Sequence, residues 1–400
     1  MKVTRSLIAT AATALLLSAC NDSTNAGSSS AGSDGPFKLL VISQLDAAAF
    51  SFPEIEYGAK SSASATNAAG GIGGHKVQVD VCNDQGDPNV AATCGRKAVQ
   101  GGYAAVVNTT SLYAASFMPL LESGKVPAVG GTPLTAPDFT SKMSFPIAGG
   151  NPLDYGGVGF VAAKGGCKTA AVIRDTAAAV DASTKAIKAG FQAAGGTAIS
   201  DSHVIKLAGT SPDFSGPVSQ VVSSGVQCLL VAEQPQALPK IIGAVRQSAK
   251  PRLPVHTLAV AFPKALVTSL GKAADGVVVN DSIAIPSQTG TPSFWADMEK
   301  YAPKADKTGH SLRGWAAVQV IAQVAKEAKA YDHSSLLAAL QKATGVKAEG
   351  LAASLDFSQP NTKADVARVF AKKNFAYTVG KGDYNPLFGG KPVDVSAALR

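Results

Sequence analysis

Hydroxyl side chains gather in two stretches of the chain that each follow a short apolar run. Thr109, Thr110 and Ser111 follow the run 104–107, and Thr132 and Thr135 follow the run 126–129. Hydroxyls beside free backbone N–H groups at a helix start suit a carboxylate, because the helix dipole and the unpaired donors both favour an anion. These stretches therefore predict a site that binds a small carboxylate. The alternative is that the same hydroxyls only cap the helices that follow.

The sequence carries no arrangement typical of covalent, metal-dependent or nucleotide-dependent catalysis. G-x-S-x-G, H-E-x-x-H and Walker motifs are missing, and the histidines lie far apart without ligand spacing. Residues 157–162 (GVGFVA) match the dinucleotide fingerprint G-x-G-x-x-A. That motif must follow a strand and open a helix, whereas here it lies inside a predicted helix that precedes a strand. We therefore expect no enzyme activity, no cofactor and no metal.

Short β-rich runs alternate with longer Ala-rich segments from Phe37 onward, and this pattern predicts parallel βαβ units. Strands are expected at 38–43, 77–81, 104–107, 126–129, 169–173, 203–205, 228–231 and 255–258. Helices are expected at 55–69, 88–100, 114–122, 155–164, 182–194, 213–224, 239–249 and 312–330. Asp87, followed by Pro88, is expected to cap the second of these helices. The series restarts after about residue 150, which predicts two α/β lobes with doubly wound parallel sheets.

The N-terminus has the pattern of an export signal. Lys2 and Arg5 precede the apolar run 6–17, which is shorter than the roughly 20 residues of a membrane span. Residues 17–20 (LSAC) resemble a bacterial lipobox, in which Cys20 carries the lipid; a plain signal peptide over residues 1–20 is the alternative. Residues 21–36 are rich in Ser and Gly and predict a flexible linker. We expect an exported chain, lipid-anchored at the outer face of the cytoplasmic membrane or in the periplasm.

Four cysteines remain after Cys20, and an even number in an oxidising compartment favours disulfides. Three pairings are possible, and we favour Cys82–Cys94 and Cys167–Cys228, one in each lobe. A zinc site is the alternative, which the lack of any C-x-x-C pair disfavours.

Charge gives no reason to expect a nucleic-acid partner. The chain has 36 basic and 28 acidic residues, a formal net charge of +8, and its lysines are scattered. No basic stripe interleaved with aromatic residues is present, so a solvated surface is the simpler interpretation.

Residues 67–88 (NAAGGIGGHKVQVDVCNDQGDP) resemble the N-A-A-G-G-I-N-G signature, and its later D-x-x-(S/G)-(D/N)-P, of type I periplasmic binding proteins. The proteins with this signature serve branched-chain amino acid transporters. The glycines of this block predict a turn from helix to strand, because glycine adopts positive φ at little cost. Residues 104–113, 126–138 and 170–175 follow the order of the family, and the resemblance extends roughly from Phe37 to Phe375.

The resemblance implies two α/β lobes with doubly wound parallel sheets, joined by three crossover segments near Pro152, Asp281 and Phe357. The N-terminal lobe would comprise residues 37–152 and 281–357, and the C-terminal lobe residues 153–280 and 358–400. A small molecule would bind between the lobes, at the carboxyl ends of the strands, where parallel α/β sheets place their ligands.

The resemblance also implies which residues of the first lobe contact a ligand. Ser111 and Thr135 would hold the α-carboxylate of the ligand, with the backbone of Leu134 nearby. An alignment shifted by one residue would place Leu112 there instead of Ser111.

Aromatic residues near the first strand give further candidates. Phe50 and Phe52 lie where the family presents an aromatic wall, and core packing is the alternative for each. Tyr113 is a third candidate, with packing of its own loop as the alternative.

The second lobe departs from the family pattern. Residues 175–180 (DTAAAV) lack the expected aromatic, and residues 260–262 (VAF) lack the acid that grips a ligand's ammonium. Glu233, just after the strand 228–231, is the candidate negative charge, because a buried ammonium without an anionic partner is costly. An aliphatic or aromatic carboxylate, or an amide, competes with an amino acid as ligand.

The function implied is that of a monomeric, extracytoplasmic substrate-binding lipoprotein of an ABC importer. It would capture a branched-chain or other amino acid, or a related small carboxylate or amide, and deliver it to a membrane permease. A sensory receptor on the same fold is the alternative, and an enzyme is disfavoured because no nucleophile–base set is visible.

Overall fold

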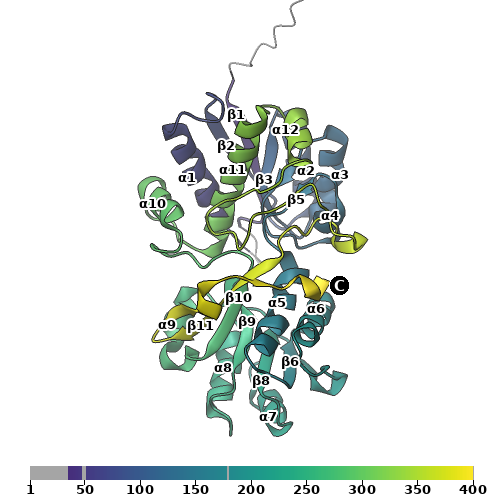
Figure 1. The fold of residues 1–400 in the computed structure, drawn as a ribbon, viewed down its shortest axis with the longest axis vertical. Helices are drawn as coiled ribbons and strands as arrows, with labels where there is room; N and C mark the ends of the chain where they lie inside the picture. The colour runs from purple at the N-terminus through teal and green to yellow at the C-terminus, as the bar shows by residue number, and fades with distance from the viewer. Residues whose placement is uncertain (1–34, 47–50, 178–179, 400) are drawn as a thin grey trace, which may run out of the picture. The chain divides into compact units, whose positions relative to one another are not determined.

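A computed structural model describes residues 35–46, 51–177 and 180–399. The chain divides into two units, residues 1–34 and 35–400. The predicted signal peptide, Cys20, most of the predicted linker and Phe50 lie outside the described residues. The unit 35–400 contains two lobes, which are shown in Figure 1.

The first lobe is built on a parallel sheet that has, among the described residues, the strand order β2-β1-β3-β4-β5. Its strands are β1 (Phe37–Ser43), β2 (Val77–Asn83), β3 (Ala105–Thr110), β4 (Ala128–Val129) and β5 (Ser144–Phe145). Its helices are α1 (Glu54–Ala68), α2 (Pro88–Gln100), α3 (Ala114–Gly124), α4 (Ala136–Thr140), α10 (Pro292–Tyr301), α11 (Gly309–Ala328) and α12 (His333–Leu340). Every β1 residue except Lys38 is buried, as expected of a central strand covered on both faces.

The second lobe is built on a mixed sheet with the order β12-β11-β10-β9-β8-β6-β7 among the described residues. Its strands are β6 (Ala170–Arg174), β7 (Val204–Lys206), β8 (Cys228–Ala232), β9 (Val255–Leu258), β10 (Val277–Asp281), β11 (Lys373–Gly380), β12 (Asp383–Pro386) and β13 (Val393–Asp394). Its helices are α5 (Gly150–Lys164), α6 (Val180–Ala193), α7 (Ser215–Ser223), α8 (Leu238–Gln247) and α9 (Lys264–Leu270). Strands β6 to β9 are parallel, as predicted, and β10, which the sequence did not predict, is parallel to β9, whereas β11, β12 and β13 pair antiparallel.

Local sequence signals account for several element boundaries. The Asp87 carboxylate accepts hydrogen bonds from the backbone N–H groups of Asn89 and Val90, which confirms the predicted cap of α2. Gly70, Gly71, Gly73 and Gly74 all have positive φ, between 60° and 94°, in the predicted turn from α1 to β2. At Gly71 a side chain would also collide with the carbonyl oxygen of His75, 2.1 Å from an added Cβ.

The fingerprint-like glycines 157–162 lie inside α5, as predicted, where they allow helices to approach closely. A Cβ at Gly159 would lie 2.0 Å from the carbonyl oxygen of Ile187 in α6, and one at Gly190 would lie 1.9 Å from that of Gly156. The C-terminal segment uses the same gap: Ala398, in the 3₁₀ turn Ser396–Leu399, is buried 2.5 Å from the Cβ position of Gly156. Packing of α5 against α6 therefore explains Gly159 and Gly190, whereas a Cβ at Gly157 would lie 2.3 and 2.5 Å from the amide nitrogens of Asn374 and Asn280.

The chain passes between the lobes where the crossover segments hydrogen-bond to one another. The N–H of Gly149 donates to the Ser282 hydroxyl (2.9 Å), and the Asn280 amide donates to the carbonyl of Asp154 (2.9 Å). The third passage comes later than Phe357, near which the sequence placed it. Phe357 and Phe370 both pack on Phe145 of the first lobe, and the chain joins the second sheet only at Lys373.

Two disulfides link Cys82 to Cys94 and Cys167 to Cys228, the pairing favoured from the sequence. Among the described helices, none is long and apolar enough to cross a membrane.

Candidate functional site

The carboxyl end of β3 carries the first group of predicted site residues. Ser111 is buried, and its hydroxyl donates to the Asp84 carboxylate while accepting from the N–H of Tyr113 (3.0 Å). The Thr110 carbonyl accepts hydrogen bonds from the hydroxyl of Ser43, at the end of β1, and from the backbone N–H of Gln44. A ligand that used the Ser111 hydroxyl would therefore have to compete with Asp84.

The second group of predicted site residues follows β4, and the hydrogen-bond donors of Leu134 and Thr135 are likewise bonded to a carboxylate of the chain. One oxygen of Asp138 accepts hydrogen bonds from the N–H of Thr135 (2.9 Å), the Thr135 hydroxyl (2.9 Å) and the N–H of Leu134 (3.2 Å). Burial raises the pKa of Asp138 to about 6. An internal carboxylate thus takes the donors that the sequence assigned to the carboxylate of a ligand, and Thr135 acts as a helix cap.

Thr132 is the hydroxyl of this loop that remains available. Its N–H donates weakly to the Thr110 hydroxyl (3.4 Å), while its own buried Oγ1 has no hydrogen-bond partner in the described part of the chain. The glycine before it fixes the path of the loop, because a Cβ at Gly131 would lie 2.1 Å from the carbonyl oxygen of Thr109. A buried hydroxyl without a partner is costly, so Thr132 is a candidate ligand contact.

The described aromatic candidates, Phe52 and Tyr113, lie in different surroundings. Phe52 lies half-buried after β1, with its ring 4.5 Å from the ring of His310 at the start of α11. Tyr113 is the residue before α3 and, like Phe52, packs against the core of the first lobe. Burial and the nearby Arg313 charge lower the pKa of His310 to about 3, so its imidazole is neutral at physiological pH. Its Nδ1 has no partner among the residues described.

Arg313, one turn further along α11, is 1% exposed and pairs with Asp281 at the end of β10 (Nη2–Oδ1 2.6 Å). Its Nε and Nη1 find no acceptor within the described residues. Asp154 lies close by and accepts from the N–H of Ser282 (3.1 Å). Burial and the Asp281 charge raise the pKa of Asp154, against the opposing effect of Arg313. One guanidinium therefore balances two buried carboxyl groups where the lobes join.

The second lobe contributes a buried acid, Glu233, directly after β8. Glu233 is 5% exposed, and neither of its carboxylate oxygens has a hydrogen-bond partner among the described residues. A Cβ at Gly209 would lie 3.2 Å from oxygens of both Glu233 and Asp175, so the two acids converge on this glycine. Burial, followed by the Asp175 charge, raises the pKa of Glu233 to about 8. The carboxyl is therefore mostly protonated at neutral pH.

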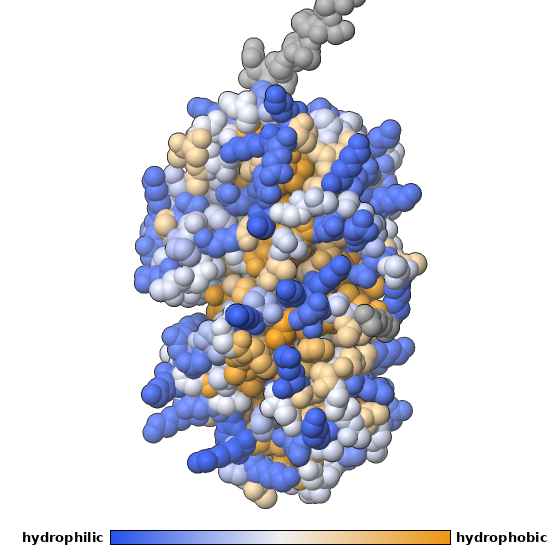
Figure 2. All heavy atoms as spheres, viewed as in Figure 1, coloured by the Kyte–Doolittle hydropathy of each residue, from blue (hydrophilic) through white to orange (hydrophobic). Residues whose placement is uncertain are grey.

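These groups belong to one edge of each sheet, where the lobes meet. Glu233 follows β8 and Val260 follows the neighbouring strand β9, while Phe52 and Thr132 follow strands of the first sheet. A Cβ at Gly309 would lie 3.1 Å from Nη1 of Arg313 and 3.8 Å from Cγ1 of Val260, which brings α11 against the second lobe. Figure 2 shows an indentation of the surface, on the left, at the level where the lobes join.

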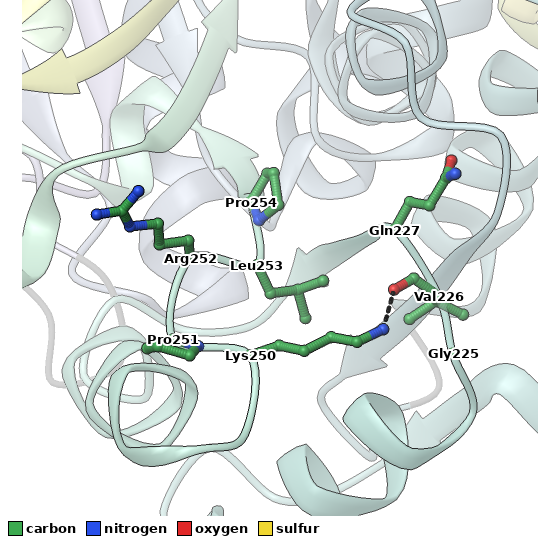
Figure 3. A pocket seen from close by; sticks show the side chains of 8 residues that line it. All are labelled: Gly225, Val226, Gln227, Lys250, Pro251, Arg252, Leu253 and Pro254. Carbon is green, nitrogen blue, oxygen red and sulfur yellow. Dashed lines mark hydrogen bonds between the residues drawn. The ribbon is translucent and has the colours of Figure 1, made fainter.

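A separate surface groove of about 480 Å³ lies at the opposite end of the second sheet (Figure 3). It is lined by residues 225–227 and 250–254, which precede β8 and β9, and the ammonium of Lys250 donates across it to the carbonyl of Val226 (3.4 Å). Ligands of parallel α/β sheets bind at the carboxyl ends of strands, so this groove is not the predicted site.

The sequence singled out Glu233, Phe52 and the hydroxyl loops, but it missed His310 and Arg313. Arg313 falls inside the helix expected at 312–330, and His310 was counted only among the histidines that lack ligand spacing. A histidine and an arginine three positions apart at the start of α11, the arginine buried and the histidine half-buried, were the available signal.

Comparisons with known proteins agree with this architecture. A sequence model described as "Periplasmic binding protein" matches residues 46–374. A search of curated proteins finds no match.

Solved structures share the fold at low identity. A putative branched-chain amino acid ABC transporter protein from Rhodospirillum rubrum has a TM-score of 0.70 and 18% identity, covering 88% of this chain and 100% of its own. A leucine-binding protein from Thermotoga maritima has a TM-score of 0.65 and 15% identity, covering 87% and 97%. A solute-binding protein from R. palustris in complex with benzoate has a TM-score of 0.68 and 16% identity, covering 90% and 98%.

Proposed function

The chain belongs to the periplasmic binding protein family, and from that premise we propose that it is the solute-binding lipoprotein of an ABC importer. Membership implies a location outside the cytoplasm. In this proposal Cys20 carries the lipid, the chain acts as a monomer, and its ligand-bound form is recognised by a membrane permease. The export pattern of residues 1–20 and the two-lobed fold support this assignment.

The proposed ligand is a small amino acid, and the observation that carries this choice is the unpartnered, buried carboxyl of Glu233. A ligand ammonium would supply the missing donors and would ionise Glu233. On the side of the first lobe, the carboxylate of the ligand would meet the Thr132 hydroxyl and the Nε and Nη1 atoms of Arg313, rather than Ser111 or Thr135. Phe52 and His310 would cover its side chain.

A simple carboxylate is the second candidate ligand, and the raised pKa of Glu233 favours it. A protonated Glu233 donates a hydrogen bond to a carboxylate without needing a cation. The solved relatives named for leucine and for benzoate correspond to these two classes.

A thermal-shift screen of amino acids, amides and small carboxylic acids tests the proposed function. A true ligand at about 100 times its Kd stabilises the folded state by about 2.7 kcal/mol, enough to raise Tm by roughly 5 °C. Small-angle scattering should show compaction with the same compound, because a ligand that contacts both lobes favours their closure. If no compound of the panel shifts Tm or compacts the chain, the proposal fails.

The pH dependence of binding should separate the two ligand classes. At pH 7 a group with a pKa near 8 is about nine-tenths protonated, so an ammonium that binds to ionised Glu233 should release about 0.9 proton. Affinity for an amino acid should therefore rise with pH up to about 8. Affinity for a simple carboxylate should fall above pH 8, because Glu233 then loses the proton it donates.

Calorimetric titration of leucine and of benzoate, each in two buffers of different ionisation enthalpy, measures this proton release directly. Equal heats in both buffers at pH 7, with a bound amino acid, would show that Glu233 does not meet the ammonium.

A further inference from the structure

Buried side chains of the second lobe, away from the site above, bring together three metal-binding groups. Cys167 lies in the turn between α5 and β6, Cys228 begins β8 and His256 lies in β9. Ligand atoms of the three residues all lie within 4.8 Å of one another. The residues are 8%, 0% and 5% exposed, so water does not separate them.

The sheet register explains why residues so distant in sequence meet. Leu230 pairs with His256 across β8 and β9, and Cys228 lies two positions before Leu230 on the same strand. Alternate residues of a strand share a face, so Cys228 and His256 lie on the same side of the sheet. Cys167 and Cys228 also belong to one apolar cluster with Val158, Leu230 and Leu258, which places them beneath α5.

His256 is the unexplained member of this cluster. Its Nδ1 is buried and has no hydrogen-bond partner within the described residues. Burial lowers the pKa of His256 to about 4, so the imidazole is neutral. A buried imidazole nitrogen without a partner is costly, and a ring nitrogen of His256 lies within 4.8 Å of both sulfurs, close enough to share a cation with them.

We propose that Cys167, Cys228 and His256 form a latent Cys₂His site for Zn²⁺ or a similar d¹⁰ cation, available when the Cys167–Cys228 disulfide is reduced. Thiolates and imidazole are the ligands that zinc prefers, and three protein ligands leave one coordination position for water. Tetrahedral zinc needs thiolate sulfurs about 3.8 Å apart, from Zn–S bonds of about 2.3 Å. The three ligand atoms already lie within 4.8 Å of one another, and reduction of the disulfide frees the two sulfurs to separate toward this spacing.

The chemistry has two balanced steps. A phosphine reductant and one water reduce the disulfide to two thiols, and the phosphine becomes its oxide. The metal ion then displaces one proton from each thiol and accepts a lone pair from His256.

Figure 3 shows the surface groove that lies at the amino ends of β8 and β9. The groove is lined by Gln227, which immediately precedes Cys228, and by Pro254, which precedes Val255 at the start of β9. A cation therefore has a solvent-exposed hollow at the amino ends of the two strands that carry Cys228 and His256.

Co²⁺ titration of the full chain, in a Cys20→Ser background, tests the proposal. With phosphine, we expect one Co²⁺ per chain, with the thiolate-to-cobalt absorption and visible bands of a tetrahedral site, displaceable by Zn²⁺. Without phosphine, neither the thiolate-to-cobalt absorption nor the visible bands of a tetrahedral site should appear. Replacing His256 with Asn should weaken the binding of Co²⁺ by about tenfold or more. Replacing Cys228 with Ser should abolish the thiolate-to-cobalt band.

The other disulfide supplies the matched control. A Cys82→Ser/Cys94→Ser variant should keep the full spectrum, because no histidine has been found in a metal-binding group with that pair among the described residues. Zn²⁺ should also protect Cys167 and Cys228 of this variant from iodoacetamide, a readout that needs no change to the site. A reduced protein without the tetrahedral bands, or a His256→Asn variant with unchanged affinity, would overturn the proposal.

Discussion

Replacing Glu233 with Gln is expected to weaken the binding of an amino acid by about 2 kcal/mol or more, a loss of about 30-fold, at pH 8. The amide keeps the size and one acceptor of the side chain but cannot balance the charge of an ammonium. The buried position of Glu233, with both oxygens lacking partners among the described residues, makes that charge hard to replace with water. Titration calorimetry of both proteins with the same amino acid measures the effect.

Glu327→Gln is the matched control, because Glu327 is exposed on α11, where it accepts a hydrogen bond from Gln323. That variant should bind like the parent. The Glu233→Gln protein should also lose the proton release expected at pH 7. Unchanged affinity together with unchanged proton release would remove Glu233 from the site.

The same variant has a stability signature that does not depend on any ligand. The pKa of Glu233 is raised from 4.5 to about 8 in the folded state, so its stabilising contribution is complete below about pH 4.5. That contribution is lost as pH rises through 8. Glu233→Gln should therefore be more stable than the parent at pH 9 and closest to it at pH 4.5, as measured by urea unfolding.

Replacing Arg313 with Met is expected to destabilise the chain by about 3–5 kcal/mol at pH 8, because two buried carboxyl groups then lose their cation. Arg313 and Asp281 are both almost inaccessible and lie 2.6 Å apart, and Asp154 shares the same surroundings. Without the guanidinium, the pKa of Asp154 rises further, because the Arg313 charge is what lowers it. Protonation should then relieve the repulsion, so the deficit should shrink as pH falls toward 5.

Urea unfolding at pH 8 and pH 5 checks this prediction. Arg96→Met is the matched control, since Arg96 is exposed on α2 and donates only to Thr93. That variant should stay within about 0.5 kcal/mol of the parent at both pH values. A deficit in Arg313→Met that is the same at both pH values would show that lost packing, rather than unbalanced charge, causes it.

Local patterns in the sequence predicted the fold well where a few neighbouring residues decide the conformation. The glycine turn after α1, the Asp87 cap and β9 all lie where the pattern placed them. The third crossover was misplaced because Phe357 joins an aromatic cluster with Phe145 and Phe370, a contact between segments far apart in the chain. The antiparallel strands β11 and β12 were likewise not among the expected strands, and β11 pairs with β10, a strand far from it in the chain.

The site was predicted less completely, because its polar groups are decided by partners distant in sequence. Glu233 could be found because it directly follows a strand. The Thr135–Asp138 pair was also visible, since Thr-Ala-Pro-Asp has the spacing of a capping box, but the hydroxyl was interpreted as a ligand contact first. The acceptor for Ser111 lies 27 residues away, and the acid that pairs with Arg313 lies 32 residues away, so neither partner could be inferred locally.

The packing of Ala398 into the gap left by Gly156 has a practical consequence for fusion proteins. Residues 393–399 are anchored by the β13–β11 pair and by the buried side chains of Ala398 and Leu399. A fluorescent reporter joined directly after residue 399 would disturb the packing of Ala398 against α5 and α6. A biosensor built on this scaffold therefore needs a spacer there.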